Sequence, residues 1–438
     1  MSDEFSDKAL NPDILIVGAG PAGIAAATAV RASGKSVTIV DDNPTPGGQI
    51  WRGAQRHNTD GQGETWLRRY ERLSAPTINS ARVISASAMD QTVLLETAER
   101  PLEIRFEKLI LATGARELFL PFPGWTLPGV MGVGGIQAMA KSGLPIKGKK
   151  VVLAGSGPLL LAVASYFRKH GATVNLIAEQ TPRSALAGFV GKLIPHPSKI
   201  LQAIQLQSSL IGVPYLTDCW VERAEGQGRL QQVVLRKREK TRDKSWTETC
   251  DYAGIAYGLQ PNTELAALVG CDIADQAIRV DEDQQTSASS IYAAGECTGI
   301  GGVDLAVIEG QIAGYSACGQ RDHAARVQAQ RKKALRFALA LKQAFPLREE
   351  LKQLPRPDTI VCRCEDVTFR QLENAGSFRS AKLHSRCAMG PCQGRICGPA
   401  AKFLFGWEAD SIRPPIFPAR IGSLLLESTT PKESSLTL

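Results

Sequence analysis

Residues 14–41, ILIVGAGPAGIAAATAVRASGKSVTIVD, decide the fold of this chain. A short apolar run leads into a glycine-rich turn, which is followed by a helix-forming stretch and a second apolar run. Gly18 permits a tight turn, Gly20 lets the backbone approach a pyrophosphate, and Gly23 lets the helix pack close to the strand. The order of these parts predicts a dinucleotide-binding unit rather than a glycine-rich turn without a ligand.

An acidic residue ends the second apolar run. Asp41 follows Gly23 after seventeen intervening residues, so its carboxylate is expected at the strand end, where it can bind ribose hydroxyls. The start of the intervening helix offers free N–H groups and the positive end of its dipole to phosphates. The first set of predicted cofactor-binding residues is Gly18, Gly20, Pro21, Ala22, Gly23 and Asp41.

Three later segments indicate a flavin. GGQIWR (47–52) follows the second strand in a turn-rich loop, LILATGARE (109–117) predicts a strand, and IYAAGECTGIGG (291–302) predicts a strand before a helix. This layout resembles flavoprotein reductases with two dinucleotide domains, in which the acidic residue of the last segment meets the ribityl chain; here it is Glu296. An ordinary buried strand and helix is the alternative for that segment. The added candidates are Gly48, Gln49, Arg52, Thr113, Gly114, Gly295 and Glu296.

A second nucleotide-type unit covers residues 149–179. It repeats the strand, the turn GSGPLL and the helix, and its next strand ends near Glu179. Leu160 replaces the third glycine, and its bulk should prevent the closest approach of helix and strand. NAD, another nucleotide such as one of the ATP type, or a scaffold without ligand all stay open. If a dinucleotide binds, Glu179 without an adjacent arginine favours NAD over NADP.

Half of the ten cysteines lie close together near the C-terminus: Cys362, Cys364, Cys387, Cys392 and Cys397. Two pairs of thiolates can hold a two-iron cluster, which takes four cysteine ligands. Structural zinc usually has two to four residues between paired ligands, and the first pair here has only one, which favours iron. Reduced thiols packed as small hydrophobic residues are the remaining alternative.

Composition limits the other classes of function. The chain has 438 residues, 43% of them apolar, which predicts two or three domains. The apolar runs are too short to span a bilayer, and the acidic N-terminus does not resemble a secretory signal. Crowded thiols suit a reducing cytoplasm. A formal charge of +8 without an aromatic-interleaved basic stripe predicts no nucleic-acid binding and at most peripheral contact with a membrane.

Catalytic acid–base residues remain unknown from the sequence. The five histidines fall in no triad or metal spacing, and no Cys-x-x-Cys pair precedes residue 360. A disulfide reductase of this architecture would need two such thiols near the flavin, so that activity is not expected.

Four long motifs carry a specific resemblance. They are GGQIWR (47–52), ATGARELFLPFPGWTLPGVMGVGGIQAMAKSG (112–143), AAGECTGIGGVDLAVIEGQIAG (293–314) and CRCEDVT with MGPCQGRICG (362–398). Together they resemble the larger, FAD-binding component (the A or alpha chain) of bacterial heteromeric opine and amino-acid dehydrogenases. That family includes the corresponding components of opine oxidase, of hydrogen cyanide synthase (its B component) and of D-hydroxyproline dehydrogenase.

The resemblance implies cofactors and partners. The cysteine region is similar to a [2Fe–2S] domain of the bacterioferritin-associated ferredoxin (BFD) type, whose ligands fall on Cys362, Cys364, Cys392 and Cys397, with Cys387 as a possible substitute. A D-amino-acid-oxidase-like flavoprotein subunit is expected to oxidise a C–N bond. This chain would relay the electrons through FAD and the cluster, in some members with a small ferredoxin-like subunit.

The expected fold class is α/β, with two Rossmann-like domains and a small C-terminal BFD-like domain. The expected boundaries are 10–145 with 285–325 for the FAD domain, 146–284 for the second nucleotide domain, 326–357 for a helical linker, 358–405 for the [2Fe–2S] domain and 406–438 for an extension. Two other functions stay open: a stand-alone NAD(P)H:acceptor reductase of the ferredoxin type, and a zinc-stabilised scaffold subunit without catalysis.

Overall fold

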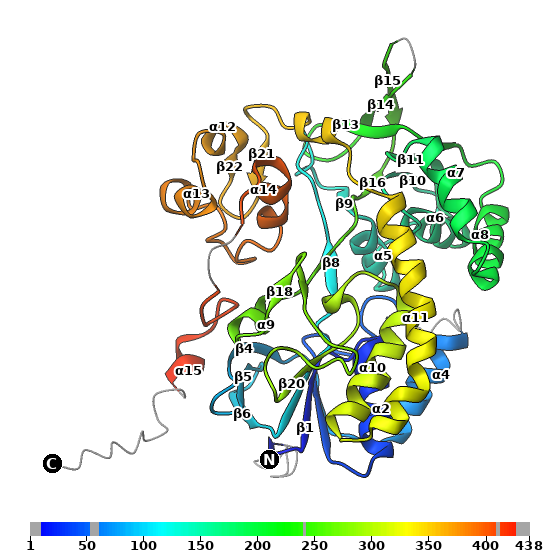
Figure 1. Cartoon of the computed structure of the whole chain (residues 1–438). Helices are drawn as coiled ribbons and strands as arrows, with labels where there is room; N and C mark the ends of the chain where they lie inside the picture. Colours follow the sequence, from blue (N-terminus) through cyan, green and yellow to red (C-terminus); the bar gives the residue numbers. More distant parts are fainter. Residues whose placement is uncertain (1–9, 53–60, 240–241, 409–411, 426–438) are drawn as a thin grey trace. The chain divides into compact units, whose positions relative to one another are not determined.

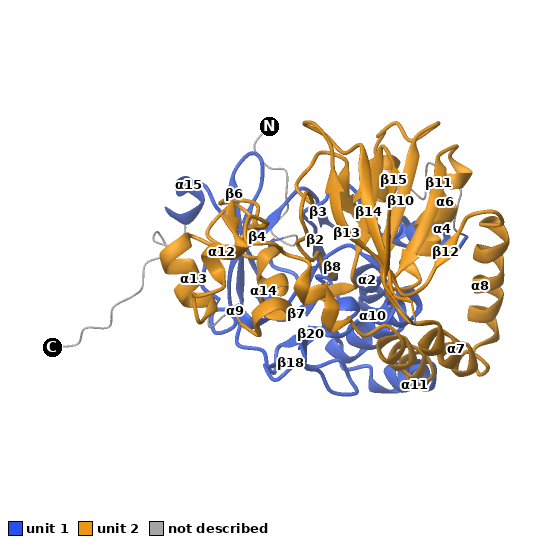
Figure 2. Ribbon diagram, turned by 90° about the horizontal axis from the view of Figure 1, so that it is seen from above, with its two compact units in different colours: residues 1–114, 261–331, 411–438 blue, residues 115–260, 332–410 orange. Residues whose placement is uncertain are grey.

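The computed structural model describes residues 10–52, 61–239, 242–408 and 412–425. The expected absence of an N-terminal signal concerns residues that lie mostly outside these ranges, as do residues 409–411 and 426–438 of the predicted C-terminal extension. The chain divides into two compact units, shown in two colours in Figure 2. The first comprises residues 1–114, 261–331 and 411–438, and the second comprises 115–260 and 332–410.

A parallel five-stranded sheet forms the centre of the first unit, in the order β20-β7-β1-β2-β3. Its strands are β1 (Ile14–Val17), β2 (Val37–Val40), β3 (Thr77–Ile78), β7 (Lys108–Leu111) and β20 (Ile291–Ala293). β1, β2 and β20 are buried along their whole length, which explains their continuous apolar sequences, since parallel sheets are covered on both faces.

Helices α2 (Pro21–Ala32) and α10 (Val303–Ala317) pack against each other beside this sheet (Figure 1). Their contact depends on small residues. A Cβ atom at Gly310 would lie 2.1 Å from the carbonyl oxygen of Ala22, and one at Gly314 would lie 2.5 Å from that of Ala26. The glycines of the motif VIEGQIAG therefore allow the helices to approach backbone to backbone.

The remaining elements of the first unit are smaller. They are α4 (Gly61–Arg72), β4 (Arg82–Ser87), β5 (Thr92–Glu96), β6 (Pro101–Arg105), α9 (Glu264–Leu268), β18 (Ile273–Ala274), β19 (Ala277–Ile278), η1 (Glu296–Thr298) and α15 (Ile421–Leu424). The long helix α11 (Arg321–Ala344) starts in the first unit and ends in the second.

The second unit contains another parallel five-stranded sheet, in the order β12-β11-β10-β16-β9. Its strands are β9 (Val130–Gly132), β10 (Lys150–Gly155), β11 (Thr173–Glu179), β12 (Tyr215–Leu216) and β16 (Tyr252–Ala256). An antiparallel sheet joins β13 (Cys219–Glu225), β14 (Gln232–Lys237) and β15 (Lys244–Thr249). The helices are α5 (Val133–Lys141), α6 (Leu159–Lys169), α7 (Arg183–Lys192) and α8 (Pro197–Ser209). A further pair joins β8 (Ala115–Glu117) to β17 (Leu259–Pro261).

The cysteine-rich region of the second unit has its own small core. Its elements are η2 (Glu349–Gln353), β21 (Ile360–Cys362), β22 (Val367–Thr368), α12 (Phe369–Leu372), α13 (Phe378–Ser385) and α14 (Cys397–Phe405). Three cysteines are part of this core beside Val361 and Leu372. Such a short segment buries few large side chains, so a bound metal would contribute much to its stability.

The two Rossmann-like sheets confirm the predicted α/β class, but two expected domain boundaries need correction. Strand β9, which the boundary at residue 145 placed in the FAD domain, pairs with β16 of the second sheet. Residues 261–284, expected in the second domain, belong to the first unit, where Leu265 and Val269 join its core. The boundary at residue 145 was expected from chain length and the order of the motifs, whereas this position lies between α5 and β10 of the same unit.

Candidate cofactor sites

The first glycine turn has the geometry that its sequence predicts. Gly18 has a φ of +110°, and a Cβ atom there would lie 2.2 Å from the carbonyl oxygen of Ala112. A Cβ atom at Gly23 would lie 1.8 Å from the carbonyl oxygen of Gly18. These positions therefore require glycine, because any side chain would push the turn away from the sheet or from the helix. Pro21 begins α2, as its fixed φ favours at the first helical position.

Asp41 holds the turn and the following loop together. Its Oδ2 accepts a hydrogen bond from the amide of Ala19 at 2.5 Å, and its Oδ1 accepts one from the amide of Asn43 at 2.7 Å. The side-chain amide of Asn43 also donates to Oδ1, and its own oxygen accepts a hydrogen bond from Arg52. Asp41 thus lies at the predicted strand end, with Arg52 linked to it through Asn43.

The loop after β2 lies against the glycine turn. The amide of Gly47 donates to the carbonyl of Ala19 at 2.8 Å, and a Cβ atom at Gly48 would lie 3.0 Å from the Cα of Gly20. Two glycine backbones therefore face each other with no side chain between them. Gln49 is exposed beside them.

Glu296 offers an unused carboxylate oxygen to a ligand. Its Oε1 accepts a hydrogen bond from the amide of Gly302 at 2.7 Å, whereas its Oε2 is buried without a hydrogen-bond partner. Burial raises the pKa of Glu296. An oxygen of this kind is costly unless something donates to it, and a ribityl hydroxyl of a flavin is a suitable donor.

Thr113 and Gly114 follow β7 and are half-buried. Thr113 donates through Oγ1 to the carbonyl of Asn262 at 2.8 Å, and the Asn262 side chain donates to the carbonyl of Thr113 at 2.8 Å. The first unit thus collects three segments that are distant in sequence, as the flavoprotein layout predicts. The glycine cradle and the unpartnered Glu296 oxygen fit a bound FAD.

A second acidic residue near this site was missed by the sequence analysis. Glu309 of α10 accepts hydrogen bonds from the amide of Gly295 at 3.1 Å and from Oγ1 of Thr298 at 3.0 Å. It also pairs with Arg331 of α11. Burial raises the pKa of Glu309, and the guanidinium of Arg331 opposes that rise. The sequence signal that could have identified Glu309 is its position as the one glutamate within the largely apolar sequence VDLAVIEGQIAG.

The second glycine turn is closed by side chains of its own unit. Glu179 is fully buried; its Oε2 accepts from the amide of Gly157 at 2.8 Å, and its Oε1 accepts from the amide of Thr181 at 2.8 Å. Burial raises the pKa of Glu179. Leu160, at the position of the third glycine, lies on α6 and is buried in the same core as Val151 and Leu153 of β10.

Three of the five C-terminal cysteines form a buried group. The Sγ atoms of Cys362, Cys387 and Cys397 all lie within 4.8 Å of one another, and all three residues are buried. Cys387 and Cys397 are 3.9 Å apart at sulfur. Cys364 and Cys392 lie outside this group and interact electrostatically with each other. The structure thus places two of the expected ligands in the buried group and two outside it, and adds Cys387 to the buried group.

A cavity of about 460 Å³ adjoins the buried group and the two other cysteines. All four predicted ligands line it, whereas Cys387 does not: the lining residues include Cys362, Cys364, Cys392 and Cys397 together with Phe119, Trp125, Met131, Met139 and Ile396. At one side Glu117 accepts hydrogen bonds from the amides of Gly134 and Gly135 at 2.6 and 3.0 Å, which caps the start of α5. Burial raises the pKa of Glu117.

Comparison with known protein families identifies the family of this chain. A model described as "Pyridine nucleotide-disulphide oxidoreductase" matches residues 12–317. The chain belongs to the pyridine nucleotide-disulphide oxidoreductase family. Membership of this family implies FAD, in agreement with the glycine cradle of the first unit.

Two relatives of similar sequence are subunits of larger enzymes. Hydrogen cyanide synthase subunit HcnB of Pseudomonas aeruginosa is 31% identical, over 87% of this chain and 90% of its own length. The A component of opine oxidase from Rhizobium meliloti strain 1021 is 30% identical, over 94% of this chain and 98% of its own. These relatives confirm the resemblance drawn from the sequence motifs and support a flavoprotein oxidoreductase.

Solved structures of this oxidoreductase fold also match. L-proline dehydrogenase from P. horikoshii has a TM-score of 0.68 and 18% identity, and the match covers 94% of this chain and 79% of that chain. Thioredoxin reductase from T. acidophilum has a TM-score of 0.56, with 21% identity over 72% of this chain and 99% of that chain. At these identities the matches establish the fold alone.

Among the described residues, no helix combines the length and the apolar character needed to cross a membrane.

Proposed function

We propose that this chain is the FAD- and [2Fe–2S]-containing electron-transfer subunit of a heteromeric dehydrogenase that oxidises the C–N bond of an amino acid or an opine. One observation carries the proposal: a chain with a flavin-type cradle also has a cysteine-rich region in which four of the five cysteines line one cavity. The names of the relatives, which are subunits of hydrogen cyanide synthase and of opine oxidase, support a role within a larger enzyme.

The first unit supplies the flavin site in this proposal. The turn at Gly18–Gly23 would face the pyrophosphate, Asp41 the ribose, and Glu296 the ribityl chain. The remaining candidates flank these groups: Gly48, Gln49 and Arg52 on the loop after β2, Thr113 and Gly114 after β7, and Gly295 before Glu296. FAD, when bound, supplies two-electron chemistry, and an iron–sulfur cluster supplies one-electron transfer.

The cysteine region supplies the metal site. We assign Cys362, Cys364, Cys392 and Cys397 as ligands, since all four line one cavity. The buried position of Cys387 beside Cys397 makes it the substitute to test. Thiolate donors in this number suit a [2Fe–2S] cluster.

The proposed partner is a D-amino-acid-oxidase-like flavoprotein subunit, with a small ferredoxin-like subunit as a further component and the cytoplasm as the site of action. Substrate oxidation would occur on the partner. Electrons would then pass through this chain to an external acceptor.

The test is co-expression with the oxidase-like partner, anaerobic purification and assay of D- and N-substituted amino acids with an artificial electron acceptor. Bound FAD, iron, acid-labile sulfide and partner-dependent oxidation are expected. A Cys362→Ser variant should lose iron and sulfide, while Cys318→Ser, in the first unit, should keep both. Zinc without iron or sulfide would contradict the proposal and favour the scaffold alternative.

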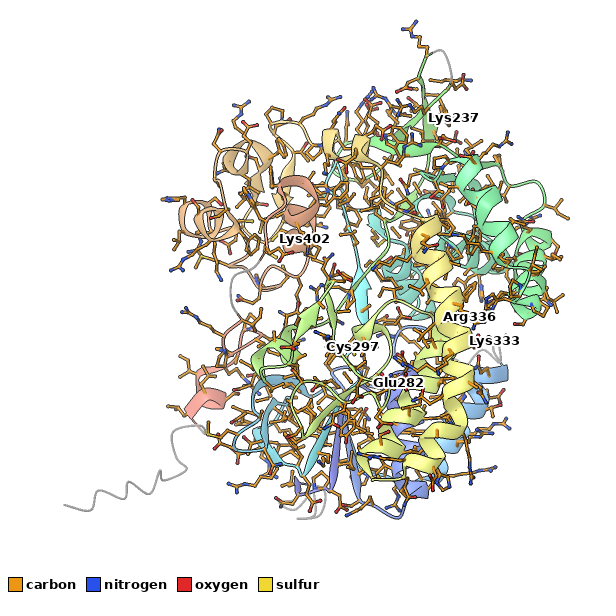
Figure 3. All side chains as sticks on the ribbon, in the orientation of Figure 1. Lys237, Glu282, Cys297, Lys333, Arg336 and Lys402 are labelled. Atoms are coloured by element: carbon orange, nitrogen blue, oxygen red, sulfur yellow. The ribbon has the colours of Figure 1, made fainter. Side chains whose placement is uncertain are left out.

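A second test addresses the flavin cradle. Glu296→Ala removes the unpartnered oxygen, so FAD should bind about tenfold more weakly or worse. Glu282→Ala changes an exposed acid of the same unit and serves as the control (Figure 3). Equal FAD affinity in both variants would contradict the assigned role of Glu296.

A further inference from the structure

The two glycine turns of this chain have similar sequences but different accessibility. Gly18 and Gly20 in the first turn are partly exposed, and the residue after Asp41 is exposed as well. Gly155 and Gly157 in the second turn are buried. A turn that receives a dinucleotide must present its amides to the ligand, because the pyrophosphate lies at the helix start. The second turn is covered instead by residues of its own unit.

Gln180, which directly follows Glu179, is the first of these covering residues and is 0% exposed. Its Nε2 donates to Oγ of Ser156 in the glycine turn at 3.0 Å and to the carbonyl of Pro346 at 2.9 Å. Its Oε1 accepts a hydrogen bond from the amide of Arg348 at 3.1 Å. One side chain therefore bridges the turn to the segment that follows α11.

Arg348, which lies in that segment, makes further contacts within the second unit. Its NH1 group donates to the carbonyl of Gln180 at 3.1 Å and to Oδ1 of Asp218 at 2.9 Å, and the Arg348 side chain is 11% exposed. Its guanidinium carbon lies 5.1 Å from the ring centroid of Trp220. The ring of Phe345 packs at 5.5 Å from that of Phe189 on α7. Residues 345–348, here called the closing segment, are thus held by the residue after β11, by residues at the start of β13 and by α7.

Glu179, the acid of the second turn, makes two backbone hydrogen bonds, as Asp41 does in the first turn. The difference between the two turns is that Gln180, the residue after the acid, is buried, whereas the residue after Asp41 is exposed. In a Rossmann-type unit the acid at this strand end meets the adenosine ribose. A ribose could reach Glu179 only after Gln180 and the closing segment had moved.

We propose that Gln180 and Arg348 are specificity-determining residues, which hold the closing segment over the second nucleotide turn and exclude NAD(H) and NADP(H). The retained nucleotide domain then serves as a dock for the closing segment. If nicotinamides are excluded, reducing equivalents enter this chain from a protein partner. This consequence rests on the proposed function.

The experiment is an NADH titration of the full-length chain with its first site saturated by FAD. NADH fluorescence and calorimetry monitor binding. The wild-type chain should show a dissociation constant above about 1 mM and no bleaching of the flavin. The double variant Gln180→Ala/Arg348→Ala should bind NADH at least about tenfold more tightly, because two side chains that fix the closing segment are gone. Arg379→Ala, an exposed arginine on α13, should behave as wild type.

Two results would overturn the proposal. One is a wild-type chain that binds NADH as tightly as the double variant does. The other is a double variant that keeps its circular-dichroism spectrum and FAD content but gains no affinity for NADH. If the double variant does not fold, the single Arg348→Ala variant is used, since it leaves the Gln180 bonds to Ser156 and Pro346 in place; a smaller gain of affinity is expected, and none would again overturn the proposal.

This outcome is separable from the proposed function. Iron, acid-labile sulfide and partner-dependent oxidation are measured on the same preparations without NADH. Their absence would end the electron-transfer proposal while leaving the closed nucleotide turn as it is.

Discussion

Glu309 and Arg331 form a buried ion pair, with 3.3 Å between Oε1 and Nε and side-chain exposures of 3% and 14%. Glu309 also receives the hydrogen bonds of Gly295 and Thr298, which flank Glu296. The pair therefore joins α11 to the turn that presents the candidate flavin-binding acid. Removing one partner of such a pair leaves the other charge buried, which is usually more costly than losing both.

We expect Glu309→Ala to lower the free energy of unfolding of the chain by about 3–5 kcal/mol and to weaken FAD retention. The reason is twofold: the charge of Arg331 loses its partner, and the turn around Glu296 loses two hydrogen bonds. Urea denaturation and FAD content after gel filtration measure the two effects.

Two controls accompany this variant. Glu309→Gln keeps an oxygen that can accept from Gly295 and Thr298, so it should retain more FAD than Glu309→Ala. Arg336→Ala removes an exposed arginine from the same helix as Arg331 (Figure 3) and should change the stability little. Equal losses from Glu309→Ala and Arg336→Ala would show that the buried pair has no special role.

The glycine turn gives a matched comparison between two Gly→Ala changes. Gly23→Ala would place a Cβ atom 1.8 Å from the carbonyl oxygen of Gly18, and we expect a loss of FAD together with about 1–3 kcal/mol of stability. Gly188→Ala, within α7, meets no atom within 4 Å and should stabilise the chain by up to about 1 kcal/mol. Thermal unfolding and flavin absorbance check both; a Gly23→Ala chain with full FAD content would contradict the packing argument.

Alkaline pH should reveal the burial of Cys297 in the first unit (Figure 3). Burial raises the pKa of Cys297 to about 11 from an ordinary value of 9.0. Between these values the unfolded chain loses a proton that the folded chain keeps, so the free energy of unfolding falls as pH rises. Over this range the loss from this thiol should approach about 2–3 kcal/mol.

The measurement compares denaturant unfolding of wild type and Cys297→Ala at pH 9 and pH 11. Other buried thiols, among them Cys219 and Cys250, are present in both proteins, so the difference between the two proteins isolates the contribution of Cys297. An identical pH dependence of the two proteins would refute the assigned protonation state.

The role of Cys387 is settled by a substitution. If Cys362, Cys364, Cys392 and Cys397 are the ligands, Cys387→Ser should keep its iron and sulfide, with a shifted electron paramagnetic resonance spectrum because a neighbouring sulfur has gone. Iron and sulfide analysis of the anaerobic protein measures this. Loss of the cluster in Cys387→Ser, together with its retention in Cys364→Ser, would move the ligand set to the buried group.

Local patterns in the sequence predicted the geometry of the first glycine turn well. The turn at Gly18–Gly23 and the strand end at Asp41 follow from residue types at fixed short spacings, and the structure places them together. The return of the segment around Glu296 to the first sheet was expected from the flavoprotein layout, and β20 confirms that return by pairing with β7.

Contacts between distant residues could not be derived in this way. Gln180 and Arg348 are 168 positions apart, and neither belongs to a motif. Glu309 and Arg331 lie on different helices, so helical spacing does not relate them. Cysteine spacing alone was also insufficient, because Cys387 and Cys392 have the same separation as Cys392 and Cys397, and only the folded backbone distinguishes their sulfur positions.

The exposed position of Cys364 at the cavity has a practical consequence for handling the protein. Air and peroxide would reach this sulfur before the buried ones, and thiolates that react with them proceed to sulfenic and then irreversible sulfinic acids. Preparations made in air would therefore degrade first at Cys364. Material that has lost its colour on storage should carry its oxygen adducts on that residue, where peptide mass spectrometry can count them.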